Sequence, residues 1–127
     1  MKYLIDAYAW VEYLTGGKLG EKVRELILSD NEIISLNITI AEVVSKIKRK
    51  KENAEIAYNA INSNSQIISI TPEIAKEAGI IHAETREKIK NFGLVDALLL
   101  VIAREIKAKI ITGDHHLKDF KEAIFIE

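Results

Sequence analysis

Tyr3-Leu4-Ile5-Asp6 places three large, mostly apolar side chains directly before a lone acid. Four further short runs rich in isoleucine follow later in the chain, at residues 32–36, 66–70, 109–111 and 123–126. Strands that are buried on both faces of a parallel sheet have this nearly continuous apolar character. We therefore predict five strands, the first of them at residues 3–5.

Helical patterns alternate with these runs. Apolar side chains recur at helical spacing over residues 7–14, 19–28, 40–51, 54–62, 72–90 and 94–107, and a short helix is expected after Asp114. Strands separated by helices predict an α/β fold, with a mainly parallel sheet covered by helices on both faces. With one proline, six glycines and no low-complexity tract, residues 1–127 are interpreted as a single domain.

The composition limits the kinds of metal site and binding partner that the chain can have. The chain has no cysteine, and its 18 Lys and Arg against 19 Asp and Glu leave a formal net charge of -1. Disulfides and thiolate metal sites are therefore excluded, and any metal must be held by oxygen or imidazole. A nearly neutral chain has no overall attraction for polyanions, so nucleic-acid binding would have to be local. Without a signal-peptide pattern or a long apolar span, we expect a soluble cytoplasmic protein with no membrane partner.

Four acids fall where this topology would bring them together. Asp6 closes the first strand, Asp114 closely follows the fourth, and Glu42 opens the helix that comes after the second. Parallel sheets bind ligands beyond the carboxyl ends of their strands. Asp96 lies in the first turn of the last long helix, which starts at the same edge if it runs antiparallel to the strands.

Three of these acids also have a structural interpretation. Asp6 and Asp114 sit where a helix N-cap is expected, and aspartate is a favoured cap. Thr39 and Glu42 fit the S/T-x-x-E capping box, and Lys46 stands one helical turn later as an ion-pair partner for Glu42. Taken singly, each of the three is explained by helix capping at least as well as by function.

Asp96 is harder to explain in that way. It is the only ionisable residue in the segment 94–103, which is apolar on nearly every side and is therefore predicted to be a buried helix. A lone buried carboxylate is costly unless it is paired, hydrogen-bonded or bound to a cation. Capping by first-turn amides is the structural alternative, and it would satisfy the carboxylate only in part.

A bound divalent cation would explain why four acids lie together at one edge of the sheet. Carboxylates crowded at one edge raise one another's pKa unless a cation compensates their charge. Mg²⁺ and Mn²⁺ prefer carboxylate and water oxygens, and Mg²⁺ usually takes only one or two direct carboxylates. The set predicts a Mg²⁺ or Mn²⁺ site in which some of the acids act through bound water.

The segments around these acids also resemble a known family. They are Tyr3-Leu4-Ile5-Asp6-Ala7-Tyr8-Ala9-Trp10, Thr39-Ile40-Ala41-Glu42, Gly93-Leu94-Val95-Asp96-Ala97 and Ile111-Thr112-Gly113-Asp114. In this order and spacing they are similar to PIN-domain nucleases, specifically the VapC-type toxin branch, over essentially the whole chain.

The resemblance implies a three-layer α/β/α sandwich and a Mg²⁺- or Mn²⁺-dependent endoribonuclease. It also implies a homodimer that is inhibited by a small cognate antitoxin. By position, Asp6 and Asp96 look like the principal metal ligands, with Glu42 and Asp114 completing the acidic cluster. Thr112 matches a family hydroxyl that helps to order the water of the site, and its structural alternative is a β-branched residue that ends a strand.

Basic side chains follow Glu42 along its helix. Helical spacing places Lys46 and Arg49 on the same stripe as Glu42, where an RNA backbone could follow them. The alternative is a solvated helix end, because cations are favourable near a helix C-terminus.

Other chemically capable side chains are assigned no role. His115 and His116 adjoin one of the acids, but adjacent side chains seldom face one site, so a surface turn explains them. Tyr8, Trp10 and Tyr13 follow Asp6 at mixed helical spacing. They are interpreted as core or dimer interface rather than as a base-stacking platform.

Rival functions fit less well. Neither G-x-G-x-x-G nor G-x-x-x-x-G-K-[ST] occurs, which disfavours dinucleotide and nucleoside triphosphate binding. A haloacid-dehalogenase phosphatase would need an acid at Tyr8, and a phosphoacceptor receiver would need an acid beside Asp6. Two alternatives stay open: an RNA-processing PIN nuclease without an antitoxin, and a catalytically idle module that binds RNA or protein.

Overall fold

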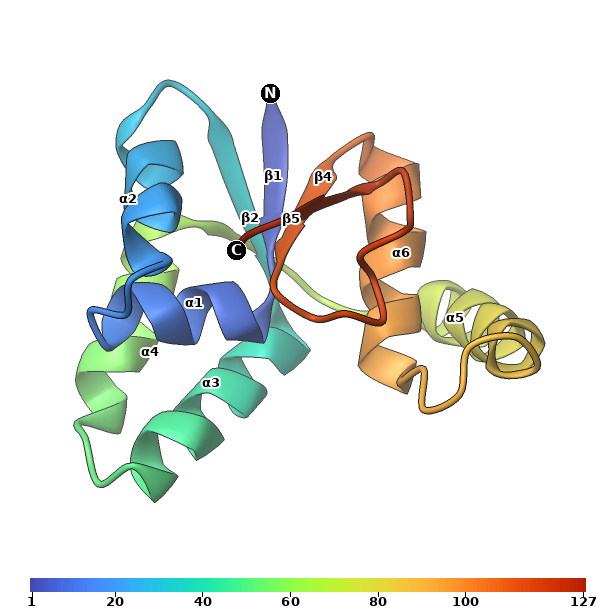
Figure 1. Cartoon of the computed structure of the whole chain (residues 1–127), viewed down its shortest axis with the longest axis horizontal. Helices are drawn as coiled ribbons and strands as arrows, with labels where there is room; N and C mark the ends of the chain where they lie inside the picture. The colour runs from blue at the N-terminus through green and yellow to red at the C-terminus, as the bar shows by residue number, and fades with distance from the viewer.

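The five apolar runs form one sheet in which every pair of neighbouring strands is parallel (Figure 1). In the computed structural model, which describes residues 1–127, the strands are β1 (Lys2–Ile5), β2 (Glu32–Leu36), β3 (Gln66–Ile68), β4 (Lys109–Thr112) and β5 (Ala123–Phe125). They lie in the order β3-β2-β1-β4-β5, so the direction of strand addition reverses at β1. Parallel sheets bind ligands at such a reversal, beyond the carboxyl ends of the strands.

Helices cover both faces of the sheet. They are α1 (Ala7–Leu14), α2 (Gly20–Leu28), α3 (Asn37–Arg49), α4 (Ala54–Asn64), α5 (Pro72–Arg86) and α6 (Leu94–Ile106). The first four pack on one face, and α5 and α6 pack on the other (Figure 1). The predicted α/β fold, a three-layer sandwich around a mainly parallel sheet, is confirmed.

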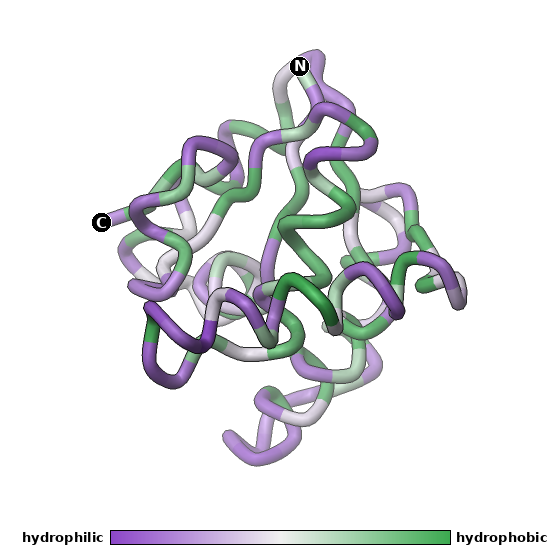
Figure 2. The backbone as a smooth tube through the Cα atoms, turned by 90° about the vertical axis from the view of Figure 1, so that its right-hand side faces the viewer, coloured by the Kyte–Doolittle hydropathy of each residue, from purple (hydrophilic) through white to green (hydrophobic).

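Alternating side chains of the central strands build a separate core on each face. Leu4 and Ile110 are fully buried against α5 and α6, whereas their neighbours Ile5 and Ile111 are fully buried among α1 to α4. Successive side chains of a strand point to opposite faces, so a strand between two helical layers needs apolar residues at every position. Figure 2 shows the result, with mostly hydrophobic segments in the middle of the molecule and helices around them in which hydrophobic and hydrophilic stretches alternate.

Two local predictions about helices are wrong. The helix α3 begins at Asn37, directly after β2, and its cap at Leu36 contributes only backbone. Thr39 therefore lies inside the first turn, where its buried hydroxyl has no hydrogen-bond partner, and the capping box with Glu42 does not form. The short helix expected after Asp114 is instead a series of turns, because the chain must return within ten residues to start β5.

No helix of the structure is both long enough and apolar enough to cross a membrane.

Candidate metal centre

Asp6 is held at the junction of β1, β4 and α1. Its amide donates to the Ile111 carbonyl at 3.1 Å, which extends the pairing of β1 with β4 by one residue. One of its carboxylate oxygens, Oδ1, accepts the Ala9 amide at 2.8 Å and caps α1. The residue is 5% exposed. The predicted N-cap is thus confirmed, and it fixes the carboxylate at the carboxyl edge of the sheet.

Thr112 lies beside Asp6, because it ends the neighbouring strand β4. Its side chain is fully buried, and its hydroxyl accepts the Asp114 amide at 2.9 Å. The same hydroxyl is a hydrogen-bond partner that lowers the pKa of Asp6. Thr112 therefore shapes the turn that carries one acid and also acts on the charge of another.

Asp96 stands in the first turn of α6, at the same edge. Its Oδ2 accepts the Gly93 amide at 2.9 Å, so the capping that the sequence left open does occur. The residue is 8% exposed, as its position in an apolar helix predicts. The Gly93 amide is the only backbone group that donates a hydrogen bond to this carboxylate. Capping therefore satisfies the carboxylate only in part, as expected.

Asp114 caps a turn instead of a helix. Its Oδ1 accepts the His116 amide at 2.8 Å. This turn brings the His116 ring back over the acids, with Nδ1 at 3.2 Å from Asp114 Oδ1 and 3.8 Å from Asp96 Oδ2. His115 points elsewhere, with its ring 5.1 Å from that of Phe125. The interpretation of both histidines as mere surface-turn residues is therefore wrong for His116.

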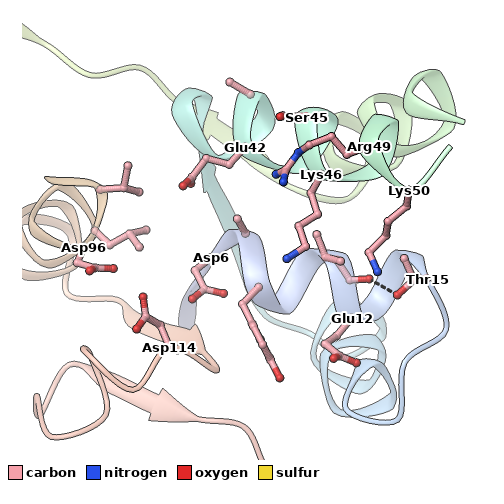
Figure 3. Close-up of a pocket in the computed structure, with 16 residues that line it drawn as sticks. Asp6, Glu12, Thr15, Glu42, Ser45, Lys46, Arg49, Lys50, Asp96 and Asp114 are labelled. Carbon is pink, nitrogen blue, oxygen red and sulfur yellow. Dashed lines mark hydrogen bonds between the residues drawn. The ribbon is translucent and has the colours of Figure 1, made fainter. Parts of the chain in front are cut away.

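A cleft of about 730 Å³ joins the acids to the basic end of α3. In Figure 3 the side chains of Asp6, Glu42, Asp96 and Asp114 gather at one end of it. Lys46 and Arg49, on the last turn of α3, and Lys50, which directly follows the helix, line the other end (Figure 3). No ion pair joins Glu42 to Lys46, so the predicted pairing of these two residues is also wrong.

Burial and crowding raise the pKa of three of the acids. The pKa of Asp6 rises to about 7, mainly through burial and in smaller part through the charges of Asp114 and Glu42. The pKa of Asp96 rises to about 6, mainly through burial and also through the charge of Asp114. Burial, Asp96 and Asp114 raise the pKa of Glu42. The acids thus disfavour one another's charged forms, which a bound cation would reverse.

The donor set fits a hard divalent cation. Asp96, Asp114 and His116 each offer one ligand atom, and these atoms lie within 4.8 Å of one another. Asp6 and Glu42 line the same cleft outside this tight group. The carboxylate oxygens suit Mg²⁺ or Mn²⁺, whereas the imidazole nitrogen of His116 is not a preferred ligand of Mg²⁺ and favours transition metals.

The family is decided by a match over nearly the whole chain. The model of the PIN domain matches residues 3–123. The chain belongs to the PIN domain family. No curated protein matches this PIN domain in sequence.

Solved structures share the fold at low sequence identity. A toxin-antitoxin complex from Klebsiella pneumoniae has a chain with a TM-score of 0.75 and 21% identity, covering 96% of this PIN domain and 95% of that chain. VapBC2 from Rickettsia felis, bound to a promoter DNA fragment, has a TM-score of 0.74 and 21% identity, with 98% and 97% covered. VapC20 of Mycobacterium tuberculosis, a toxin that cleaves the Sarcin-Ricin loop, has a TM-score of 0.72 and 17% identity, with 94% and 97% covered.

Proposed function

We propose that this PIN domain is a metal-dependent endoribonuclease of the VapC type, which hydrolyses RNA phosphodiesters in the cytoplasm. The observation that carries the proposal is the gathering of Asp6, Glu42, Asp96 and Asp114 at one end of a cleft. Two of these acids, Asp6 and Asp96, are buried there, and their charged forms are disfavoured unless a cation compensates them. The fold shared with toxins of toxin-antitoxin pairs supports the VapC assignment.

Each residue has a part in this chemistry. Asp6 and Asp96 are the principal ligands for Mg²⁺ or Mn²⁺, and Glu42 and Asp114 complete the shell directly or through water. His116 adds a nitrogen donor beside Asp114. An ion held there would activate a water molecule for attack at neutral pH and would stabilise the charge that develops on the phosphate. Thr112 positions the Asp114 turn, and no protein nucleophile is needed.

The partners follow from the same assignment. The substrate is RNA, whose backbone phosphates contact Lys46 and Arg49 at the basic end of the cleft. A small cognate antitoxin and a second copy of the chain complete the assembly. Related folds occur in structures described as VapBC complexes, which supports the antitoxin partner.

Cleavage of RNA by the Asp96→Asn variant tests the proposed activity. The purified protein, stripped with EDTA, is incubated with short single-stranded RNAs with and without Mn²⁺. We expect cleavage only with the metal, and a loss of at least about 100-fold in the variant, since removing one centre of transition-state stabilisation typically costs that much. Asp30→Asn, an exposed acid before β2, is the matched control and should cleave normally. Cleavage by Asp96→Asn at the normal rate, or none by the wild-type protein, would contradict the proposal.

The salt dependence of RNA binding tests the basic end of the cleft. Each phosphate contact that is removed should make the slope of log K against log salt shallower by about 0.7 for a single strand. The double variant Lys46→Gln with Arg49→Gln should therefore make it shallower by about 1.4. Binding is measured in EDTA by fluorescence anisotropy. Lys48→Gln with Lys76→Gln removes the same charge from exposed positions outside the cleft, and equal slopes in both double variants would exclude the RNA contact.

A further inference from the structure

Tyr8 departs from the pattern of the other aromatic residues of α1. Trp10 is fully buried, and its Nε1 donates to Ser35 Oγ at 2.9 Å. Tyr13 packs edge-on against Trp10, with ring centroids 5.8 Å apart. Tyr8 is 44% exposed and lines the cleft together with Asp6 and Asp114. The core interpretation holds for Trp10 but does not describe Tyr8.

The backbone of the turn after β4 supports one side of the Tyr8 ring. A Cβ added to Gly113 would collide with Cε1 and Cδ1 of Tyr8, so the ring and the glycine approach more closely than any other residue type would allow. Gly113 has no positive φ, so this close approach is what its lack of a side chain permits. An exposed aromatic ring that the fold holds in place is suited to stack on a flat ligand.

The position of the Tyr8 ring in the cleft indicates which kind of ligand it would contact. Tyr8 lies two residues after Asp6, and its support, Gly113, directly precedes Asp114, so the ring borders the acidic end of the cleft. The basic side chains of α3 lie at the other end of the same cleft (Figure 3). An RNA strand that has the cleaved phosphate at the acids and its next phosphates at the basic end would present a base near Tyr8. Aromatic rings combined with a basic track are the usual means of binding single strands.

We propose that Tyr8 stacks on an unpaired nucleobase next to the phosphate that is cleaved. This inference rests on the proposed ribonuclease function and narrows its substrate to single-stranded or looped RNA. A paired base is stacked within its own helix and offers no free face to the ring, so a duplex fits the site poorly. The base's flat face, which all four nucleobases share, is what the ring contacts.

Fluorescence of 2-aminopurine tests the stacking directly. The probe is a single-stranded RNA of eight nucleotides with 2-aminopurine at one position, bound to EDTA-treated protein so that no cleavage occurs. We expect quenching at one position of the strand with the wild-type protein and with Tyr8→Phe, and its loss with Tyr8→Leu. Tyr58→Leu is the matched control, because Tyr58 is also 44% exposed but lies on α4 outside the cleft. Equal quenching by Tyr8→Leu and the wild-type protein would overturn the proposal.

Cleavage kinetics separate this inference from the proposed function. With Mn²⁺, we expect Tyr8→Leu to raise KM about tenfold on the intact strand, in keeping with the loss of one base stack, while leaving KM unchanged on a strand that is abasic at the quenched position. An equal rise in KM on both strands would refute stacking while the nuclease assignment stands. If Tyr8→Leu changed the oligomeric state measured by sedimentation and left RNA binding unaltered, the stacking proposal would be overturned in favour of a protein interface at Tyr8. Absence of any cleavage by the wild-type protein would refute the nuclease function, and the quenching experiment would still decide the stacking.

Discussion

Two buried acidic environments in this molecule are built differently. Glu122, which precedes β5, is 7% exposed, and its Oε2 lies 3.4 Å from Arg104 Nε on α6. Asp6 and Asp96 are about as deeply buried, yet no lysine or arginine nitrogen lies within 4.0 Å of either carboxylate. The base that does approach the cluster is the imidazole of His116.

The difference is the one expected between a structural acid and the acids of the proposed metal site. Arg104 on α6 supplies a cation to Oε2 of Glu122, while the buried Oε1 has no hydrogen-bond partner. At the carboxyl edge of the sheet, several acids repel one another and the chain supplies no permanent cation, so the charged cluster is costly until a cation arrives from solution. The following predictions test that contrast.

Mn²⁺ should give the largest effect, because the proposed function requires it to bind the folded state at the cluster. At a concentration about 100-fold above its Kd, the ion should raise the free energy of unfolding by about 2.7 kcal/mol. Asp96→Asn should show a much smaller increase, whereas Arg104→Gln, which alters only the Glu122 pair, should show the full one. Thermal unfolding across a Mn²⁺ series at constant ionic strength measures this. If Asp96→Asn responded like the wild-type protein, the ion would bind elsewhere.

The pH dependence of the metal-free protein is the next largest effect. Burial raises the pKa of Asp6 to about 7 from 3.8, so between these values the folded state keeps a proton that the unfolded state has released. Through this group the free energy of unfolding falls as pH rises from about 4 to about 7, and it stays low above pH 7. Asp6→Asn removes the penalty and keeps the helix cap, since asparagine caps as well as aspartate.

Asp6→Asn should therefore stabilise the metal-free protein at pH 8 by roughly 2 kcal/mol, about half of what a shift of three pKa units represents. At pH 4 it should have little effect. Urea denaturation in EDTA at both pH values measures the difference, with Asp30→Asn as the control that should change neither. A destabilised Asp6→Asn protein at pH 8 would mean that this carboxylate is structural, as Glu122 is.

Much of the fold follows from the sequence because burial on both faces leaves a local signature. Runs such as Tyr3-Leu4-Ile5 predicted the strands. Successive residues of a central strand face opposite helical layers, so nearly every position is apolar. Asp96 was identified because it stands alone in an apolar helix, and the structure buries it. Both signals lie within a few residues of the position that they describe, so no long-range contact has to be known.

The parts that the sequence misses depend on contacts between distant segments or on the geometry of one turn. The start of α3 is set by where β2 ends against the sheet, which the pattern Thr39-x-x-Glu42 does not encode. His116 reaches the acids because Asp114 accepts its amide, and a search for an acid followed two residues later by histidine would have indicated it. Tyr8 depends on Gly113, more than 100 residues away, and no local pattern contains that contact.

The smallest effect concerns the two bases themselves, Arg104 and His116. Arg104→Gln leaves the buried Glu122 carboxylate without its cation and should cost about 1–2 kcal/mol of unfolding free energy, the range for a buried polar group that loses its partner. His116→Gln should cost less than about 0.5 kcal/mol in the metal-free protein, since the imidazole side chain is 38% exposed and exposed pairs contribute little. Urea denaturation in EDTA at pH 8 compares the two, and Arg104→Lys should recover part of the loss. If His116→Gln cost as much as Arg104→Gln, the cluster would already contain its own counter-cation, and the contrast between the two acidic environments would disappear.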